Sequence, residues 1–412
     1  MSGQDSFWRI GPRGFSVVAL ILVAAVLNYV DRQALALLKP TLDQRFGFGD
    51  AGYASIVNAF LITYTLSFLV SGRVIDRIGP RAGIAWCLGF WSLANAGMAF
   101  ATSIDHILIS RALLGLGEAG LWVAVPRLAA ERYLPRTRGI VLGLATMGAT
   151  IGATIAPPLV VALAGDTGEH WTWAFLATGL MGLAVVPLWW LVCPPSPSAT
   201  EATKTPALGT LAVLRLIVLR REVWLLILTR LITDPVWYFY QSWFPTFLHQ
   251  KHGWSQADIK HAWFVYLPAD LGCLLGGFLA AWRIGKGIEP HRGRLQIMLF
   301  CCLLTPLSAV VALSGSQALV LAASMFVIGA HLAWLANVSA LTAELLPPAQ
   351  TATVFGIVAA ASATGGILMN SWIGAHATGD GMVSFLIIAA CVHPLAWILC
   401  AVLGRRWSTS SP

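Results

Sequence analysis

The amino-acid sequence predicts an all-α integral membrane protein, with twelve transmembrane helices in two pseudo-symmetric six-helix bundles. Three observations support this fold class: the composition, a series of apolar runs and an internal repeat. Of the 412 residues, 57% are hydrophobic and only 11% are charged, and the mean hydropathy is +0.74. A soluble domain has about 25% charged residues. A soluble core cannot hide this much apolar surface, so we expect the lipid bilayer to be its main partner.

Twelve apolar segments are long enough to cross a bilayer, which requires about 20 helical residues. In chain order they are residues 14–38, 52–72, 80–101, 105–128, 138–164, 171–192, 223–248, 257–282, 294–314, 317–345, 350–374 and 381–404.

The longest break between these segments, residues 193–222, divides the chain. It opens with CPPSPSATEATKTPALG, whose Pro, Ser and Thr residues are typical of a linker. It ends with LAVLRLIVLRRE, a basic pattern that predicts a short amphipathic helix on the membrane surface. We therefore expect an N-terminal six-helix bundle at 1–192, a cytoplasmic linker at 193–222 and a C-terminal six-helix bundle at 223–412.

Two stretches in corresponding positions of these halves are related. ERYLPRTRGIVLGLATMGATIG begins at Glu131, and ELLPPAQTATVFGIVAAASATG begins at Glu344. When the two are aligned, Gly152 coincides with Gly365. Two related halves joined by a basic loop are the layout of a secondary transporter with a cavity near the midplane of the membrane.

Lys and Arg are unevenly distributed between the connecting loops. If both termini are cytoplasmic, eighteen of the 26 Lys and Arg residues lie on the cytoplasmic side and four lie outside. This asymmetry is the positive-inside pattern of multi-pass membrane proteins. We therefore expect the cell's inner membrane with both termini cytoplasmic, and the net charge of +8 requires no nucleic-acid partner.

Four charged residues interrupt the first and fourth apolar segments. Asp31 and Arg32 lie in VLNYVDRQALALLKP, and Arg111 and Glu118 lie in RALLGLGEAGLW. A rise of about 1.5 Å per helical residue puts the two sets at a similar depth in the outer part of the membrane, with Glu118 about 10 Å deeper than Arg111. Charges at such a depth are costly and usually functional.

An arginine and a carboxylic acid have complementary uses in a carrier of anions. Arg offers a planar fork for a carboxylate and does not titrate in the working range, whereas a carboxylic acid can bind and release a proton. The pattern therefore predicts that Arg32 or Arg111 binds an anionic substrate, and that Asp31 or Glu118 carries protons. The alternative is that Asp31–Arg111 or Arg32–Glu118 forms a permanent structural ion pair.

The second half also carries polar and aromatic side chains within its apolar segments. Asp270 is a second-rank proton site. Arg230 and Asp234 are four residues apart, which favours a structural ion pair, and a core role is favoured over a proton role for His331. For the aromatic residues of this group, such as Tyr238, packing in the protein core is almost as good an explanation as contact with the substrate. The predicted substrate contacts are Tyr238, Gln241, Trp334, Asn337 and Asn370.

The loop after the second segment, GRVIDRIGPR at residues 72–81, fits the pattern G-x-x-x-D-R-x-G-x-R. At this point the chain resembles the major facilitator superfamily, in which this loop is a cytoplasmic gating latch. The matching residues are Gly72, Asp76, Arg77 and Arg81. We expect Gly72 to let the second and third helices approach closely, and Asp76 to cap a helix or pair with a basic residue. The equivalent loop of the second half has Ala281 at the Asp position, so its latch is degenerate.

The resemblance narrows to the anion:cation symporter family and, within it, to the hexuronate-transporter branch. It rests on LNYVDRQALALLKP, RALLGLGEAGLW, GATIGATIAPPLV, TDPVWYFYQSWFPTFL and HLAWLAN, which together span nearly the whole chain. The resemblance implies proton coupling at Asp31 and Glu118, contact with the substrate carboxylate at Arg32, and contact with the sugar at Tyr29 and Tyr64. It also implies a monomer.

The sequence therefore predicts a proton-coupled symporter that imports a small organic anion by alternating access, with a sugar acid such as a hexuronate or aldonate as substrate. The alternatives within this fold are a proton-coupled metabolite or drug antiporter and a symporter of small monocarboxylates. A channel or receptor is disfavoured because the sequence has neither a filter-like loop nor a signalling domain. An enzyme is not expected, since no nucleophile–base cluster, phosphate loop or metal-ligand spacing occurs. We expect no metal and no cofactor other than protons as the coupling ion.

Overall fold

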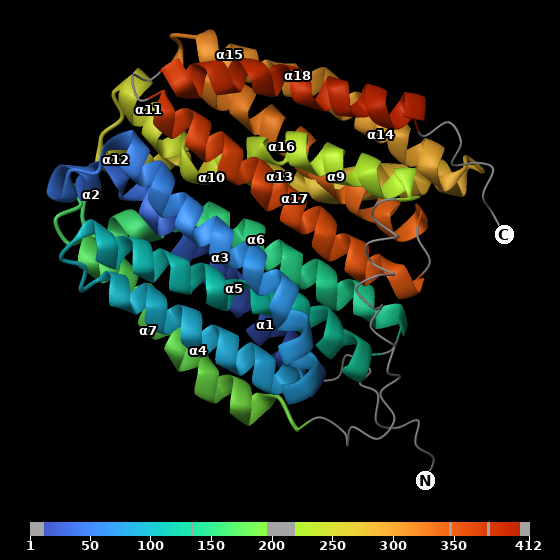
Figure 1. Cartoon of the computed structure of the whole chain (residues 1–412), viewed down its shortest axis with the longest axis horizontal. Coiled ribbons are helices and arrows are strands. Elements are labelled where there is room, and N and C mark those ends of the chain that lie inside the picture. The colour runs from blue at the N-terminus through green and yellow to red at the C-terminus, as the bar shows by residue number, and fades with distance from the viewer. Residues whose placement is uncertain (1–11, 134, 196–218, 346–347, 377–379, 404–412) are drawn as a thin grey trace. The chain divides into compact units, whose positions relative to one another are not determined.

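A computed structural model describes residues 12–133, 135–195, 219–345, 348–376 and 380–403 (Figure 1). The elements within these ranges are helices, and no β-strand occurs among the described residues. The predicted all-α class is therefore confirmed. Residues 196–218, which hold most of the predicted linker and surface helix, lie outside the described residues.

The chain divides into two compact units. The first comprises Met1–Lys204 and Trp254–Trp263, and the second comprises Thr205–Gly253 and Phe264–Pro412. The helices of the first unit are α1 (Pro12–Leu37), α2 (Lys39–Phe46), α3 (Gly49–Ile78), α4 (Pro80–Met98), α5 (Ile104–Arg132), α6 (Pro135–Ala164), α7 (Trp171–Val192), α12 (Gln256–Ile259) and η1 (Lys260–Ala262). Those of the second are α9 (Arg221–Thr233), α10 (Pro235–Ser242), α11 (Phe244–His252), α13 (Trp263–Gly285), α14 (Pro290–Leu304), η2 (Thr305–Leu307), α15 (Ser308–Leu313), α16 (Gln317–Leu345), α17 (Pro348–Ala375) and α18 (Asp380–Leu403).

The segment Trp254–Trp263 follows α11 in the chain but belongs to the first unit. Gln256 Nε2 donates a hydrogen bond of 2.9 Å to the carbonyl oxygen of Leu37, the last residue of α1. The final carbonyl groups of a helix have no partner within the helix, so Gln256 caps the end of α1. Lys260 Nζ also lies 3.4 Å from Asp166 Oδ1, in the turn after α6.

Ten stretches of the described chain are long and apolar enough to cross a membrane. The other two predicted spans correspond to α4, whose sequence includes Arg81 and Asn95 and is less apolar, and to the divided segment α9–α11. The helices are consistent with the predicted total of twelve.

The seventh predicted segment is three consecutive helices rather than one. α9 ends at Thr233, α10 begins at Pro235, and α11 begins at Phe244 with Pro245 in its first turn. A proline lacks the N–H that would continue the hydrogen-bond ladder, and its ring crowds the preceding turn. The two prolines therefore mark the two breaks.

The aligned glycines of the internal repeat have the same packing role in each unit. A Cβ on Gly152 of α6 would lie 2.5 Å from the carbonyl oxygen of Val26 on α1. A Cβ on Gly365 of α17 would likewise overlap the carbonyl oxygen of Leu231 on α9. In both halves, a glycine therefore lets the backbone of the fifth spanning helix contact that of the first.

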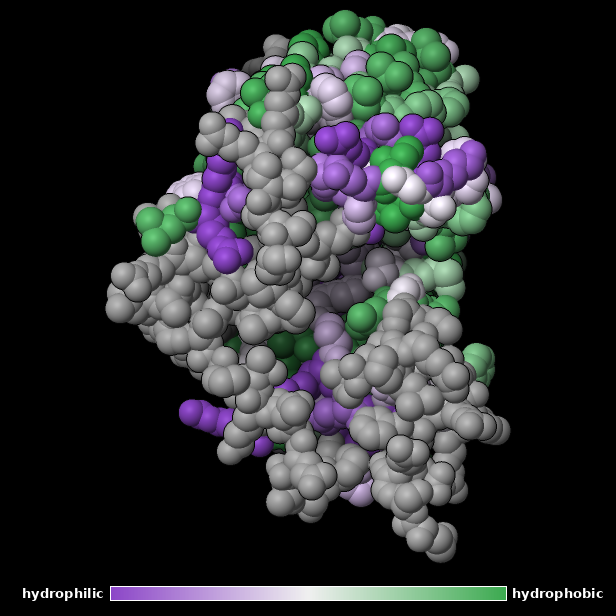
Figure 2. Space-filling model, turned by 90° about the vertical axis from the view of Figure 1, so that its right-hand side faces the viewer, coloured by the Kyte–Doolittle hydropathy of each residue, from purple (hydrophilic) through white to green (hydrophobic). Residues whose placement is uncertain are grey.

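Large apolar side chains are exposed along the spanning helices. Trp86, Phe278 and Leu303 are 71%, 66% and 70% exposed. Many large apolar side chains exposed along spanning helices are expected where the helices face lipid. Figure 2 looks onto one end of the helices, where hydrophilic residues gather, while hydrophobic residues dominate the upper part of the same view.

Candidate functional site

Arg32, near the C-terminal end of α1, lies in an aromatic cage. Its guanidinium carbon lies 5.1 Å from the ring centre of Tyr29, 5.0 Å from that of Phe60 and 4.4 Å from that of Tyr64. The Nε of Arg32 donates to Glu118 Oε2 of α5 at 2.5 Å. Ring faces and a carboxylate both stabilise a cation away from water. The structure thus brings together Tyr29, Arg32, Tyr64 and Glu118, four of the predicted site residues.

The cage retains unused hydrogen-bonding groups. Arg32 Nη2 and Glu118 Oε1 are buried and have no hydrogen-bond partner among the described residues. Asn28, one helical turn before Arg32, lies beside Glu118 without meeting hydrogen-bond geometry. Most buried polar groups in proteins are hydrogen-bonded. Unused donors and acceptors next to an arginine are the groups that a polar ligand requires, and Asn28 was not predicted.

Asp31, the neighbour of Arg32 in the chain, is directed toward different helices. Its side chain is fully buried, and its Oδ1 accepts a 2.7 Å hydrogen bond from Asn95 Nδ2 of α4. The same nitrogen lies 2.8 Å from Thr178 Oγ1 of α7. Asn95 and Thr178 were not predicted, although an Asn within an apolar helix was a visible signal.

Arg111 of α5 contacts the main chain of α1 rather than a carboxylate. Its Nη1 donates to the carbonyl oxygen of Asp31 at 3.0 Å, and its guanidinium lies 5.5 Å from the ring centre of Phe175. Among the described residues, Asp31 and Arg111 therefore do not form the side-chain ion pair that was the alternative prediction. The Arg32–Glu118 pair is formed. The carboxylate of Asp31 instead accepts its hydrogen bond from Asn95 of α4.

The glycines of α5 serve helix packing. A Cβ on Gly117 would lie 2.9 Å from the Trp91 backbone nitrogen of α4. Cβ atoms on Gly115 and Gly120 would overlap Phe60 of α3 and Cys87 of α4, respectively. These glycines therefore let α5 approach both neighbours closely, and this contact holds Glu118 at the cage.

In the latch loop, the close helix approach that was predicted at Gly72 is not found. A Cβ on Gly72 would have Val123 of α5 at 4.0 Å, which is ordinary contact, so Gly72 does not mediate the predicted close approach to the third helix. Gly79 has φ 80° and forms the turn between α3 and α4, a conformation that favours glycine. Arg81 donates from Nη2 to the carbonyl oxygen of Trp190 near the end of α7 at 2.7 Å. Arg77 is exposed, and the side chain of Asp76 lies outside the described set.

The asparagines predicted in the second half bind other protein groups. Asn337 Nδ2 donates to the carbonyl oxygens of Ala333 and Gly276 at 2.9 and 3.2 Å. Asn370 Oδ1 accepts from Trp243 Nε1 at 2.8 Å. These contacts join α16 to α13 and α17 to the α10–α11 junction.

The remaining predicted residues of the second unit differ in exposure. Gln241 and Trp334 are buried, with Gln241 Nε2 and Trp334 Nε1 lacking a hydrogen-bond partner among the described residues. Tyr238 is half-buried and borders Gly366 of α17, and Asp270 is half-buried on α13.

The Arg230–Asp234 ion pair is formed, with 2.5 Å between Nε and Oδ2.

His331 has a buried histidine partner that was not predicted. His331 Nδ1 lies 3.0 Å from His393 Nε2 of α18. Trp237 stacks on His331 with 7° between the planes, and Trp334 meets His393 edge-on. At this distance one ring donates a hydrogen bond and the other accepts it. The signal was weak in the sequence because the two histidines lie 62 residues apart.

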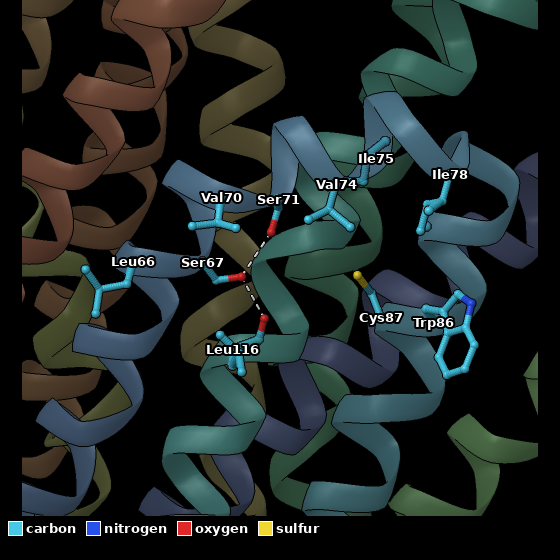
Figure 3. A pocket seen from close by; sticks show the side chains of 11 residues that line it. Leu66, Ser67, Val70, Ser71, Val74, Ile75, Ile78, Trp86, Cys87 and Leu116 are labelled. Atoms are coloured by element: carbon cyan, nitrogen blue, oxygen red, sulfur yellow. Dashed lines mark hydrogen bonds between the residues drawn. The ribbon is translucent and has the colours of Figure 1, made fainter. Parts of the chain in front are cut away.

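An apolar groove lies on the first unit between α3, α4 and α5, with a volume of about 290 Å³ (Figure 3). Its polar groups are the Ser67 and Ser71 hydroxyls, which lie 3.0 Å apart, and Ser67 donates to the carbonyl oxygen of Leu116 at 2.7 Å. Trp86 and Leu66, at its margins, are exposed. The groove offers no charge for a carboxylate, so it is distinct from the cage around Arg32.

Comparison with known proteins places this architecture in a family. The profile of the Major Facilitator Superfamily matches residues 21–370. A galacturonate transporter of Dickeya chrysanthemi is 30% identical over 283 residues, which cover 64% of this chain and 80% of that protein. A hexuronate transporter of Escherichia coli (strain K12) is 28% identical over 279 residues, which cover 64% of either chain. A D-galactonate transporter of Escherichia coli O6:H1 is 24% identical over 421 residues, covering 94% of this chain and 96% of that protein.

Two solved structures share the fold. A bacterial homologue of the human lysosomal transporter Spinster, in an inward-facing and unoccupied conformation, superposes with a TM-score of 0.78 at 21% identity, covering 94% of this chain and 97% of that one. A D-xylose–proton symporter superposes with a TM-score of 0.76 at 15% identity, covering 93% and 96%. With a family profile that spans most of the sequence, this chain belongs to the Major Facilitator Superfamily and is a multi-pass membrane transporter, not an enzyme.

Proposed function

We propose that this transporter imports a sugar acid together with protons, and that the cage around Arg32 is where the two are coupled. The observation that carries the proposal is the Arg32–Glu118 contact of 2.5 Å within the aromatic cage. A guanidinium can bind a substrate carboxylate through two parallel N–H groups, and Arg32 Nη2 is unpaired among the described residues.

Glu118 and a substrate anion compete for the same cation. While Glu118 is ionised, its Oε2 accepts the hydrogen bond from Arg32 Nε, so this donor is not available to a substrate. Protonation of Glu118 removes the charge that pairs with Arg32, so a substrate carboxylate can replace it. Uptake of a proton and of an anion then favour each other, which is the reciprocal coupling that a symporter requires. In this scheme Asp31 is a second proton-carrying group.

The cage and the relatives support the proposed substrate class. Tyr29 and Tyr64 present ring faces beside Arg32, and aromatic faces with hydroxyl groups suit a sugar ring. The relatives named as galacturonate, hexuronate and D-galactonate transporters indicate a hexuronate or aldonate. For Tyr238, Gln241 and Trp334 of the second unit we also propose substrate contact. For Asn337 and Asn370 a substrate role requires that they exchange their present partners.

The distribution of Lys and Arg supports the inner membrane with cytoplasmic termini. Single cysteines placed at Arg45 and Arg283, tested with an impermeant thiol reagent on intact cells, would report the orientation. Labelling from outside is expected at position 45 and not at position 283.

The transport test is uptake into proteoliposomes that contain the purified protein. Labelled galacturonate, glucuronate, galactonate and lactate are each offered with the outside acidic, with the pH equal on both sides, and with a protonophore. We expect a uronate or aldonate to accumulate only under the acidic-outside gradient. If only lactate accumulates, the substrate is a small monocarboxylate and not a sugar acid. If the substrate moves in the direction opposite to protons, the protein is an antiporter.

A further inference from the structure

Asn95 of α4 is held by more hydrogen-bond acceptors than it has donors. Its Nδ2 lies 2.7 Å from Asp31 Oδ1, 2.8 Å from Thr178 Oγ1 and 3.2 Å from the carbonyl oxygen of Phe175. A carboxamide nitrogen has two hydrogens. The Oδ1 of the same side chain is buried and has no partner among the described residues. The nitrogen of the carboxamide therefore faces Asp31, as an ionised carboxylate requires.

We propose that Asn95 is a positioning residue for Asp31: its N–H holds the ionised carboxylate, and its carboxamide reverses when Asp31 takes up a proton. A protonated Asp31 carries an O–H that needs an acceptor. Rotation of the Asn95 carboxamide by 180° brings its unpaired Oδ1 to that position and withdraws its nitrogen from Asp31. One side chain thereby serves both protonation states.

The reversal of the Asn95 carboxamide also changes the hydrogen bonds between α4 and α7. With Oδ1 in place of Nδ2, the contact to the Phe175 carbonyl oxygen is lost, because two acceptors then face each other. The Thr178 hydroxyl, which now donates to the carbonyl oxygen of Ala174 at 2.9 Å, becomes the available donor to Asn95. Protonation of Asp31 on α1 would thus change the hydrogen bonds that Phe175 and Thr178 of α7 make with Asn95.

The helices around Asn95 are closely packed, so α4 and α7 are in direct contact at this level. A Cβ on Gly179 of α7 would lie 2.7 Å from the Ser92 carbonyl oxygen and from the Ala96 nitrogen of α4. A Cβ on Gly182 would overlap the Ser92 hydroxyl. Backbones in contact on both sides of Asn95 leave α4 and α7 little room to shift independently of one another.

Other groups also act on Asp31. On α5, Arg111 and Glu118 lie within electrostatic range, and on α4 the indole of Trp91 is adjacent. Arg32, the next residue on α1, is paired with Glu118. Thr178 of α7 also presents its hydroxyl to Asp31, while that hydroxyl donates to the carbonyl oxygen of Ala174 at 2.9 Å. Among these groups, the Asn95 carboxamide is the one that combines a donor to the carboxylate with an unpaired acceptor.

This role rests on the proposed proton coupling but can be tested without transport. Infrared titration of the purified protein follows the carboxylic-acid C=O band that Asp31→Asn removes. In Asn95→Leu the ionised form loses a charge-assisted hydrogen bond, and the protonated form loses a neutral one about half as strong. We therefore expect the midpoint of this band to move to higher pH by about one pH unit, which is the difference between the two losses.

Ser92→Ala is the matched control, since it removes a buried hydroxyl one turn away on the same helix, and its midpoint should stay at the wild-type value. If Asn95→Leu does not fold, Asn95→Ala removes the same carboxamide without added bulk and should move the midpoint in the same direction. An unchanged midpoint in the folded variants overturns the proposal. In proteoliposomes, the pH of half-maximal uptake should follow the infrared midpoint. Wild-type protein that shows no proton-driven uptake would refute the proposed function, while the infrared midpoints would still decide the role of Asn95.

Discussion

Asp31 and Arg32 are adjacent in the chain, yet Asp31 binds Asn95 of α4 at 2.7 Å while Arg32 binds Glu118 of α5 at 2.5 Å. Successive residues of a helix point about 100° apart, since there are 3.6 residues per turn. The adjacent acid and base are therefore not an ion pair with each other. They connect α1 to two different helices, so a change of charge on one need not displace the other.

Arg32→Lys should weaken substrate binding by about tenfold or more, because a point charge cannot reproduce bidentate contact or stack on three rings. Binding can be measured by calorimetry or by ligand-induced thermal stabilisation in detergent. Arg45→Lys, at an exposed position of α2, is the matched control and should bind as the wild type does. Near-normal affinity in Arg32→Lys would remove Arg32 from the substrate site.

Glu118→Gln should keep substrate counterflow and lose accumulation driven by a pH gradient, by about an order of magnitude or more, since a neutral side chain mimics the protonated state. Asp31→Asn should impair both activities, because an amide in place of the carboxylate disturbs the contacts to Asn95 and α7. Glu222→Gln, in the first turn of α9, serves as the control. If gradient-driven accumulation survives in Glu118→Gln, the coupling group lies elsewhere, with Asp270 the next residue to test.

Asp76→Asn should slow transport while leaving substrate affinity within about twofold, because the latch motif acts on the equilibrium between conformations rather than on the site. Initial uptake rates and equilibrium binding are compared on the same preparation. A large fall in affinity with an unchanged exchange rate would contradict the latch assignment.

Gly152→Ala and Gly365→Ala should each destabilise the protein by about 1–3 kcal/mol, since the added methyl group forces two contacting backbones apart. Gly143→Ala and Gly356→Ala are matched controls from the same two helices, because a Cβ on either meets no atom within 4 Å. These controls should be neutral or more stable by about 0.5–1 kcal/mol, owing to the better helix propensity of Ala. Apparent Tm values in detergent rank the stability of the four variants. Equal values for the close-contact variants and the controls would refute the role of Gly152 and Gly365 in close helix approach.

The His331–His393 contact should appear as a coupling energy of about 1 kcal/mol in a double-mutant cycle with His331→Phe and His393→Phe. Each single change leaves a buried ring nitrogen without its partner, whereas the double change removes both. Unfolding of the four proteins provides the measurement. Additive losses would show that the two rings are merely adjacent.

The sequence predicted the spans well because hydropathy over about 20 residues is a local property. It did not predict the breaks at Pro235 and Pro245, although the prolines were visible, because length and hydropathy alone treated 223–248 as one span. It identified the four charged residues of α1 and α5 from their cost in lipid. The partners of those charges were harder to predict: Asn95 and Thr178 are 64 and 147 residues from Asp31 in the chain, and their contact depends on how tightly glycines let α4 and α7 approach.

The helices α1 and α5 bring two acids and two arginines, Asp31, Glu118, Arg32 and Arg111, into one region. With both acids ionised, these four charges sum to zero, so the empty site gives the membrane voltage no net charge to act upon. Under the proposed mechanism, one proton entering with one monovalent anion preserves that balance, and each additional proton carries one positive charge inward. The electric current per substrate, recorded on a supported membrane, would therefore count the protons that accompany each sugar acid.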